Sequence, residues 1–365
     1  MPLRIKNITI TPLKAKMERP FRTALGTHQS VDNLLMTLEL NNGTRAHGEA
    51  AIATHITGET VEQTKKNLEY MKSTMLGEPV DQYLRLSERL HRELALNPAA
   101  IAAAETALLD AFCTWQKIPL WRFFGDKCAV IKSDITIVLG NVKEAQESAK
   151  KYYKQGFRAF KVKIGNDLDL DMKRLVAVVA ATPKCKLFVD ANQGYSVEEI
   201  IKFLNECQKQ KVRIDLLEQP VPKDDWDGLK KISKLTKIPV CADESVRSLE
   251  DARKAIKKRL TPVINVKIMK CGLLHAHKIT RLAQYHGVKL MIGGMMESSI
   301  AMTASAHLAA GSGGFDYIDL DTPFFIKDGL KGNPYLSKDG TYDLRKARTG
   351  VGIELKEQAP LKTKR

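Results

Sequence analysis

The fold is decided by the stretch R-A-F-K-V-K-I, residues 158–164. Every second residue from position 160 is apolar, and Lys161 and Lys163 lie between the apolar positions, a pattern typical of a short β-strand. Alternation along a strand places both lysines on the same face of the sheet. Two ammonium groups inside a sheet are costly unless carboxylates or a binding site orient them. The stretch therefore predicts acidic partners elsewhere in the chain.

Carboxylates follow this strand at a steady interval. Three later apolar runs end in an acid and a fourth ends in a lysine, namely Asp190, Glu218, Asp243 and Lys267. The intervals are about 24 to 28 residues, close to the repeat of a (β/α) barrel, which spreads about 250 residues over eight units. Helical patterns separate the runs, and strands that alternate with helices imply parallel pairing. In such barrels the carboxyl ends of the strands carry the active site.

The first part of the chain has a different pattern. Residues 3–16 alternate like a strand, two further strand-like runs flank N-N-G at positions 41–43, a strong hairpin signal, and helical patterns follow. We therefore predict a mixed α/β protein with an α+β capping domain over residues 1–125. A modified (β/α)7β TIM-type barrel follows over residues 126–322, and the segment 323–365 returns to the capping domain.

Composition is ordinary for a soluble globular protein. Of 365 residues, 44% are hydrophobic and 27% charged. No run approaches 18 uninterrupted apolar residues, so we expect no membrane span. The six cysteines lack C-x-x-C spacing, which indicates reduced thiols in a cytoplasmic protein.

The formal net charge of +16 suggests, as one alternative, a basic nucleic-acid-binding protein. The lysines, however, are spread over predicted helix faces, as on a solvated surface. No helix-turn-helix, zinc knuckle or aromatic ribonucleoprotein motif accompanies the charge. We therefore expect no nucleic-acid partner.

Three carboxylates at successive strand ends would repel one another unless a cation lies among them. A lone acid in such a place is more often a helix cap or a surface group, but three in consecutive units next to lysine-bearing strands fit that explanation poorly. Oxygen ligands with room for substrate oxygens suit Mg²⁺. The sequence therefore predicts a magnesium site at Asp190, Glu218 and Asp243.

A divalent ion beside two lysines suits the removal of a proton from a carbon next to a carboxylate, because the ion stabilises the enediolate that forms. The base must be a neutral amine, and we expect desolvation and the nearby charges of Lys161 and the metal to lower the pKa of Lys163. If Lys163 and Lys267 lie on opposite sides of that carbon, one removes a proton and the other returns it. The result is racemisation or epimerisation; a structural ion pair is the alternative.

The ordered series K-x-K, D-x-N, E-Q-P, D-E-S and K-x-x-K-x-G resembles the muconate-lactonising subgroup of the enolase superfamily along essentially the whole chain. Enolase-type sites pair a lysine or histidine base with Mg²⁺, and the resemblance implies one Mg²⁺ per subunit. The site residues that it implies are the metal ligands Asp190, Glu218 and Asp243, the acid–base pair Lys163 and Lys267, their electrostatic neighbour Lys161, and Glu297 near the seventh strand.

Within the subgroup, D-Y-I-D-L-D-T-P at 316–323 resembles the D-x-D signature of dipeptide epimerases. Asp319 and Asp321 would bind a peptide's terminal ammonium through charge-assisted hydrogen bonds, with an acidic loop or helix cap as the alternative. Thr136 matches a substrate-contacting threonine of those enzymes. In the Ala–Glu epimerases an arginine in the first capping-domain loop, which we predict over residues 23–28, reads the distal carboxylate. Gly26 stands there, which argues against an acidic side chain.

The expected function is that of a Mg²⁺-dependent, homo-oligomeric dipeptide epimerase. It would invert the α-carbon of the C-terminal residue in a small or hydrophobic dipeptide, such as Ala-Ala or Ala with a branched residue. Arg22 or His28 could substitute for the missing arginine. The alternative enzyme is an o-succinylbenzoate synthase or a muconate-type cycloisomerase, because relatives run these reactions on one scaffold. Asp319 and Asp321 distinguish the epimerase from these alternative enzymes, since the substrates of the alternatives carry no ammonium for the two acids to bind.

Overall fold

The computed structural model describes residues 2–24, 26–165, 167–327, 329 and 332–353. Its central element is an eight-stranded parallel sheet whose strands follow one another in chain order. The sheet curls until its two edges meet, because Asp134 N donates a hydrogen bond of 2.8 Å to Ile318 O. The strands are β5 (Ile135–Ile137), β6 (Ala159–Lys163), β7 (Lys186–Asp190), β8 (Leu216–Glu218), β9 (Val240–Ala242), β10 (Val263–Val266), β11 (Lys289–Ile292) and β12 (Tyr317–Ile318).

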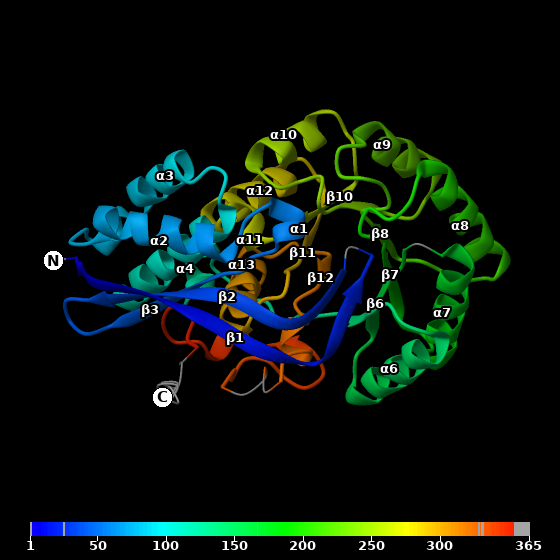
Figure 1. The fold of residues 1–365 in the computed structure, drawn as a ribbon, viewed down its shortest axis with the longest axis horizontal. Helices are drawn as coiled ribbons and strands as arrows, with labels where there is room; N and C mark the ends of the chain where they lie inside the picture. Colours follow the sequence, from blue (N-terminus) through cyan, green and yellow to red (C-terminus); the bar gives the residue numbers. More distant parts are fainter. Residues whose placement is uncertain (1, 25, 166, 328, 330–331, 354–365) are drawn as a thin grey trace.

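Helices connect each strand to the next and cover the outside of the sheet, as Figure 1 shows for α6 to α9. Capping boxes start two of them, at Asn141 with Glu144 and at Ser196 with Glu199. The helices are α6 (Val142–Gln155), α7 (Leu168–Ala181), α8 (Val197–Lys209), α9 (Trp226–Leu235), α10 (Leu249–Lys257), α11 (Ile268–Cys271), α12 (Leu273–Tyr285) and α13 (Ser299–Ser312). The predicted α/β barrel is confirmed.

The N-terminal residues form an antiparallel sheet of β1 (Ile5–Thr23), β2 (Gly26–Leu40) and β3 (Arg45–Ala50). The predicted hairpin at N-N-G joins β2 to β3. A helical layer packs on this sheet, chiefly α4 against β3. The layer contains α1 (Thr54–Thr57), α2 (Val61–Met75), α3 (Tyr83–Glu93) and α4 (Pro98–Trp115), and α5 (Leu120–Phe124) leads to the barrel.

The prediction of a loop at residues 23–28 was wrong. Strands β1 and β2 run on past Lys16 as a two-stranded ribbon in which Phe21 pairs with His28 and Thr23 with Gly26. The ribbon continues because its tip is held by the barrel: Leu139 N donates to Arg22 O at 3.0 Å. Figure 1 shows this tip reaching over the strands of the barrel.

The interior of the barrel contains two layers. An apolar layer fills one end, formed by Phe188, Leu216, Cys241, Val263, Met291 and Tyr317. Side chains two residues apart on a strand point to the same face, so the residues two positions further on also point inward. Those residues include Asp190, Glu218, Asp243 and Asp319. A charged layer therefore lies directly on an apolar floor.

The C-terminal segment contacts both parts of the molecule. Glu18 N donates to Phe325 O at 2.7 Å, and Val351 N donates to Asp110 Oδ1 at 2.7 Å. Strand β13 (Thr341–Tyr342) pairs with β4 (Ile131–Lys132), which precedes the barrel. The domain boundaries stay a prediction, and residues 354–365 of the returning segment lie outside the described residues. Within the described ranges, no helix has the length and apolarity to cross a bilayer.

Candidate active site

Strand register brings the predicted site residues together. Lys163 on β6 is the partner of Asp190 on β7, and Asp190 in turn is the partner of Glu218 on β8. Thr136 on β5 is the partner of Lys161. These residues are all buried, because the inward face of a closed barrel has no access to water except at its ends.

Lys161 is the central cation of the charged layer. Its Nζ lies 2.7 Å from Glu218 Oε2, 2.7 Å from Asp319 Oδ2 and 3.0 Å from Asp190 Oδ2. Burial acts to lower the pKa of Lys161, but the surrounding carboxylates override it and hold the pKa well above its usual value. Lys161 therefore stays charged, which suits an electrostatic role and not that of a base.

Lys163 and Lys267 come from opposite walls. Four strand positions separate β6 from β10 in the sheet order, which is half the circumference of an eight-stranded barrel. Both side chains line the same cavity at the strand ends. Lys163 Nζ lies 2.5 Å from Asp190 Oδ2, and Lys267 Nζ lies 2.7 Å from Asp243 Oδ2. Two amines therefore face one space from two sides, each held by a carboxylate.

The pKa of Lys267 lies above the usual value of a lysine. Burial acts to lower it, but the Asp243 carboxylate has the larger effect and the net direction is above the usual value. Lys267 can accept a proton from a substrate only if this carboxylate charge is balanced by another cation. The arrangement thus favours a site that also binds positive charge.

The three predicted metal ligands follow successive strands, and their ionisation depends on the lysines. Burial acts to raise the pKa of Asp190, but Lys161 and Lys163 override it and lower the pKa to about 2. Lys267 and Lys270 likewise hold the pKa of Asp243 below its usual range against the effect of burial. Burial, then the Asp190 charge, raises the pKa of Glu218 to about 8.

The donor set fits a hard divalent cation. Among the described residues, the acids that form ion pairs with the four buried lysines of the barrel are Asp190, Glu218, Asp243 and Asp319. The lysines are Lys161, Lys163, Lys267 and Lys270. Three of these acids are the predicted metal ligands. Carboxylate oxygens are the ligands that Mg²⁺ prefers.

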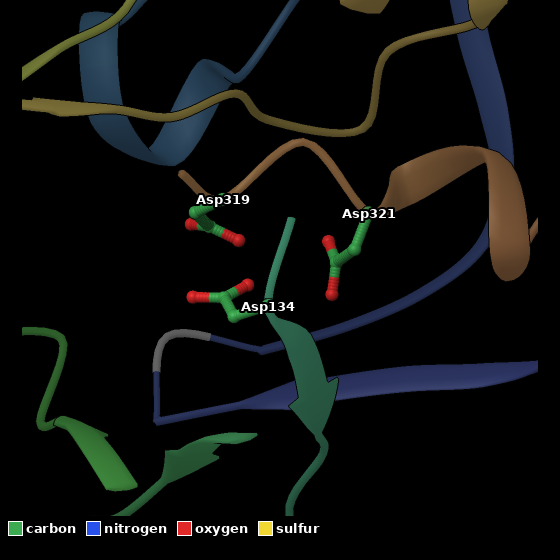
Figure 2. A group of neighbouring side chains, drawn as sticks. All are labelled: Asp134, Asp319 and Asp321. Carbon is green, nitrogen blue, oxygen red and sulfur yellow. The ribbon is translucent and has the colours of Figure 1, made fainter. Parts of the chain in front are cut away.

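The tightest cluster of carboxylates is nevertheless a different one. In the part of the chain that the structure describes, the acids whose oxygens all lie within 4.8 Å of one another are Asp134, Asp319 and Asp321 (Figure 2). The predicted ligands instead contact lysines: Lys161 Nζ lies within 3.0 Å of Asp190 and Glu218, and Lys267 and Lys270 contact Asp243. Asp134 was missed from sequence because a single acid in S-D-I-T-I has no motif around it.

Asp319, Asp321 and Thr136 form one wall of the cavity. Thr136 N donates to Asp321 Oδ2 at 2.6 Å, which fixes that carboxylate at the junction of the first and last strands. The wall lies beside Lys161, whose ammonium already contacts Asp319.

Two predicted substrate residues do not line the cavity. Glu297 is buried in the loop after β11, where its Oε2 accepts a hydrogen bond of 2.7 Å from Met295 N. Gly26 lies exposed at the ribbon tip with φ of 148°, and no atom lies within 4 Å of the position that a Cβ would take there. Its neighbours Phe21, Thr23 and His28 line the cavity in its place.

Part of the cavity lining is apolar, and the sequence alone assigns no role to its residues. Ile56 in α1 lines the cavity together with Met295 and Met296. Ile56 is 5% exposed and packs in a small cluster with Met269 and Met295. Nothing in the loop sequence marks Ile56, because its contact is with a segment that is distant in the chain.

A larger hollow lies elsewhere, between β3, α4 and the C-terminal segment. Its volume is about 940 Å³, against about 60 Å³ for the cavity at the lysines. Its charged lining includes Arg45, Asp110 and Arg348 but none of the residues of the charged layer. The chemical groups, and not the size, identify the cavity at the lysines as the candidate active site.

Two family models match the chain. Residues 144–359 match the enolase C-terminal domain-like family, and residues 5–125 match the mandelate racemase/muconate lactonizing enzyme N-terminal domain. The chain belongs to the enolase superfamily. The family predicted from the ordered lysine and carboxylate motifs is thereby confirmed.

Three relatives of this enolase superfamily member each cover 96% or more of its length. A hydrophobic dipeptide epimerase from Citrifermentans bemidjiense is 43% identical over 96% of this chain and 97% of its own. A mandelate racemase/muconate lactonizing protein from Herpetosiphon aurantiacus has a TM-score of 0.93 at 36% identity, over 98% and 99% of the two chains. A dipeptide epimerase from Enterococcus faecalis V583, complexed with Mg and the dipeptide L-Leu-L-Tyr, has a TM-score of 0.91 at 30% identity, over 97% and 100%.

Proposed function

We propose that this protein is a Mg²⁺-dependent dipeptide epimerase that inverts the α-carbon of the C-terminal residue. The observation that carries the proposal is the placement of Lys163 and Lys267 on opposite walls of one cavity that Asp319 and Asp321 also line. Relatives of similar length named as dipeptide epimerases support the same reaction.

The two amines account for inversion. One lysine removes the α-proton from one face of the substrate, and the other gives a proton to the opposite face, so the configuration changes. Proton transfer by a positioned side chain contributes about 10²- to 10⁴-fold to a rate. Lys161, charged and buried, would stabilise the negative charge that develops on the substrate carboxylate.

Asp190, Glu218 and Asp243 would hold the Mg²⁺. When bound, the ion supplies the positive charge that stabilises an enediolate. It would also balance the carboxylate charges that now hold Lys163 and Lys267, which an amine acting as a base requires. The magnesium in the Enterococcus faecalis relative supports this choice of metal.

Asp319 and Asp321 would bind the substrate's terminal ammonium. Each would accept a charge-assisted hydrogen bond, and Thr136 N would hold Asp321 in place. This subsite favours an epimerase over the alternative, an o-succinylbenzoate synthase or muconate-type cycloisomerase, since the substrates of those enzymes offer no ammonium.

The substrate side chain would lie against an apolar surface. Phe21, Ile56, Met295 and Met296 line the cavity, and burial lowers the pKa of the neighbouring His28, which favours its neutral form. An acidic side chain would find no fixed positive charge on these residues. We therefore propose small or hydrophobic dipeptides as substrates, in keeping with the name of the Citrifermentans relative.

Isotope exchange tests the proposal. A library of dipeptides is incubated with the protein in ²H₂O, and deuterium at the α-carbon is measured by mass spectrometry together with the ratio of epimers. The expected result is exchange and inversion at the C-terminal residue of small and hydrophobic dipeptides. Absence of exchange on every dipeptide would favour the cycloisomerase alternative.

A further inference from the structure

Asp134 is an unusual carboxyl group because it has no partner. It is 0% exposed, and within the described residues neither of its oxygens has a hydrogen-bond partner. It precedes β5, and its backbone N–H makes the bond that closes the barrel at Ile318. A buried carboxylate without donors is among the costliest groups in a protein interior, so its surroundings need an explanation.

Those surroundings are two more carboxyl groups. Oxygens of Asp134, Asp319 and Asp321 lie within 4.8 Å of one another, and Figure 2 shows the three groups turned toward a shared space. Asp134 does not line the cavity, whereas Asp319 and Asp321 do. Asp134 thus lies behind the pair that would meet the substrate.

The protonation state of Asp134 depends on its burial and on the charges around it. Burial first, then the charges of Asp319 and Asp321, raise the pKa of Asp134 well above its usual value, while Lys161 opposes them and Glu218 adds to them. Lys161 already contacts three other carboxylates, those of Asp190, Glu218 and Asp319, so it does not also balance the charge of an ionised Asp134. An ionised Asp134, fully buried and without a hydrogen-bond donor among the described residues, would carry an uncompensated charge.

We propose that Asp134 is a neutral carboxylic acid whose O–H donates a hydrogen bond to the Asp319–Asp321 pair, and that it thereby holds the pair in the orientation that binds the ammonium of the substrate. Asp134 is a positioning residue, and the inference rests on the proposed function for the identity of the ligand. It requires no exchange of protons with the substrate.

Kinetics of two variants test the role. Asp134→Ala removes the donor, and the expected result is a rise of about tenfold or more in the KM for L-Ala-L-Ala with a smaller change in kcat. Asp134→Asn keeps a neutral donor of the same shape, and it should recover most of that loss. Ser133→Ala is the control, because Ser133 Oγ accepts from Leu320 N in the same junction without belonging to the acid cluster; it should leave the KM close to that of the wild type.

Infrared spectroscopy tests the protonation state without activity. The difference spectrum of wild type minus Asp134→Asn at pH 7 should contain the C=O stretching band of a protonated carboxyl group. A carboxylate band in its place would overturn the proposal. If the wild type shows the acid band but exchanges no dipeptide, the proposed function fails while the state assigned to Asp134 stands.

Two further outcomes would overturn the proposal. Equal damage by Asp134→Asn and Asp134→Ala would mean that Asp134 acts as a charged ligand of the ammonium. Two Mg²⁺ ions per subunit in the wild type and one in Asp134→Asn, measured by metal analysis after equilibrium dialysis, would mean that the three acids bind a cation of their own.

Discussion

At the scale of single residues, the three lysines on the inner face of the barrel differ in their carboxylate partners. Lys161 contacts three carboxylates and stays charged, whereas Lys163 and Lys267 each contact one carboxylate and line the cavity. Three lysines that look alike in sequence therefore differ in the number of their partners. Their assignment to distinct roles stays a prediction that substitution can test.

Loss of one amine should separate exchange from inversion. Lys163→Ala should abolish epimerisation, a loss of about 10²- to 10⁴-fold, but still exchange the α-proton of the epimer that presents it to Lys267. Lys267→Ala should show the opposite preference. Deuterium incorporation into each pure epimer, followed by mass spectrometry and chiral chromatography, measures both effects.

Exposed Lys150 supplies the matched control, since Lys150→Ala should change neither quantity. Binding of Mg²⁺ to Lys163→Ala should stay near that of the wild type. Full inversion by Lys163→Ala would remove Lys163 from the acid–base pair.

Removing the charge of Asp321 should weaken the binding of ligands that carry a free terminal ammonium. Asp321→Asn should raise the KM for a dipeptide by about 10- to 100-fold, because hydrogen bonds to charged groups are worth about 1.5 to 3 kcal/mol. Affinity for an N-acetylated dipeptide, measured by calorimetry, should change less. Equal effects on the two ligands would contradict an ammonium contact at Asp321.

At the scale of elements, the ribbon of β1 and β2 and the short helix α1 make a roof over the barrel. Phe21 and His28 come from the ribbon and Ile56 from α1, and all three line the cavity. In the proposed function the reacting groups come from barrel strands, while the surface for the substrate side chain combines these N-terminal elements with Met295 and Met296 of the loop after β11. Specificity can change there without any change in the strands.

Shortening Ile56 should enlarge the space for the substrate side chain. Ile56→Ala should raise kcat/KM for dipeptides with a C-terminal aromatic residue relative to L-Ala-L-Ala, by about 10-fold, the effect of roughly 1 to 3 kcal/mol that pocket size exerts. Leu96→Ala, at a side chain that is 92% exposed, is the control. An unchanged ratio of the two substrates would show that Ile56 does not contact the side chain.

Sequence patterns predicted the barrel strands well, because alternation and short apolar runs are local. They predicted Asp190, Glu218 and Asp243 for the same reason, because each follows a short apolar run, whereas Asp319 was predicted from the resemblance to the D-x-D signature. The length of the ribbon escaped prediction, since its tip is stabilised by Leu139, far along the chain. Asp134 escaped because its contact with Asp319 spans 185 residues and exists only in a closed barrel.

At the scale of the whole molecule, one histidine joins three segments. His307 on α13 accepts from Trp121 N through Nδ1 at 3.1 Å and donates to Val351 O from Nε2 at 3.1 Å. It is fully buried, and acceptance at Nδ1 requires the neutral ring, because both ring nitrogens of a protonated histidine are donors. The helix before the barrel, the last barrel helix and the C-terminal segment are thus coupled through a single titratable group.

Acid should weaken this junction. Burial lowers the pKa of His307 from 6.5 to about 4 although the Val351 bond opposes it, so the unfolded chain binds the proton more readily. The contribution to stability is complete above pH 6.5 and is lost as the pH falls toward 4, by about 3 kcal/mol in total. His307→Gln should flatten the dependence of Tm on pH in this range, measured by calorimetry.

Exposed His286 is the control for that experiment, and His286→Gln should keep the pH dependence of the wild type. The same slope in His307→Gln and in the wild type would place the acid sensitivity at other groups.

The apolar floor of the barrel limits how reactants and products can reach the cavity. Because Phe188, Leu216, Met291 and their neighbours fill one end of the barrel, reactants and products would pass through the other end, where Phe21, His28 and Ile56 of the N-terminal elements line the cavity. A dipeptide that enters the cavity would therefore pass the ribbon, whose Arg22 O accepts a hydrogen bond of 3.0 Å from Leu139 N.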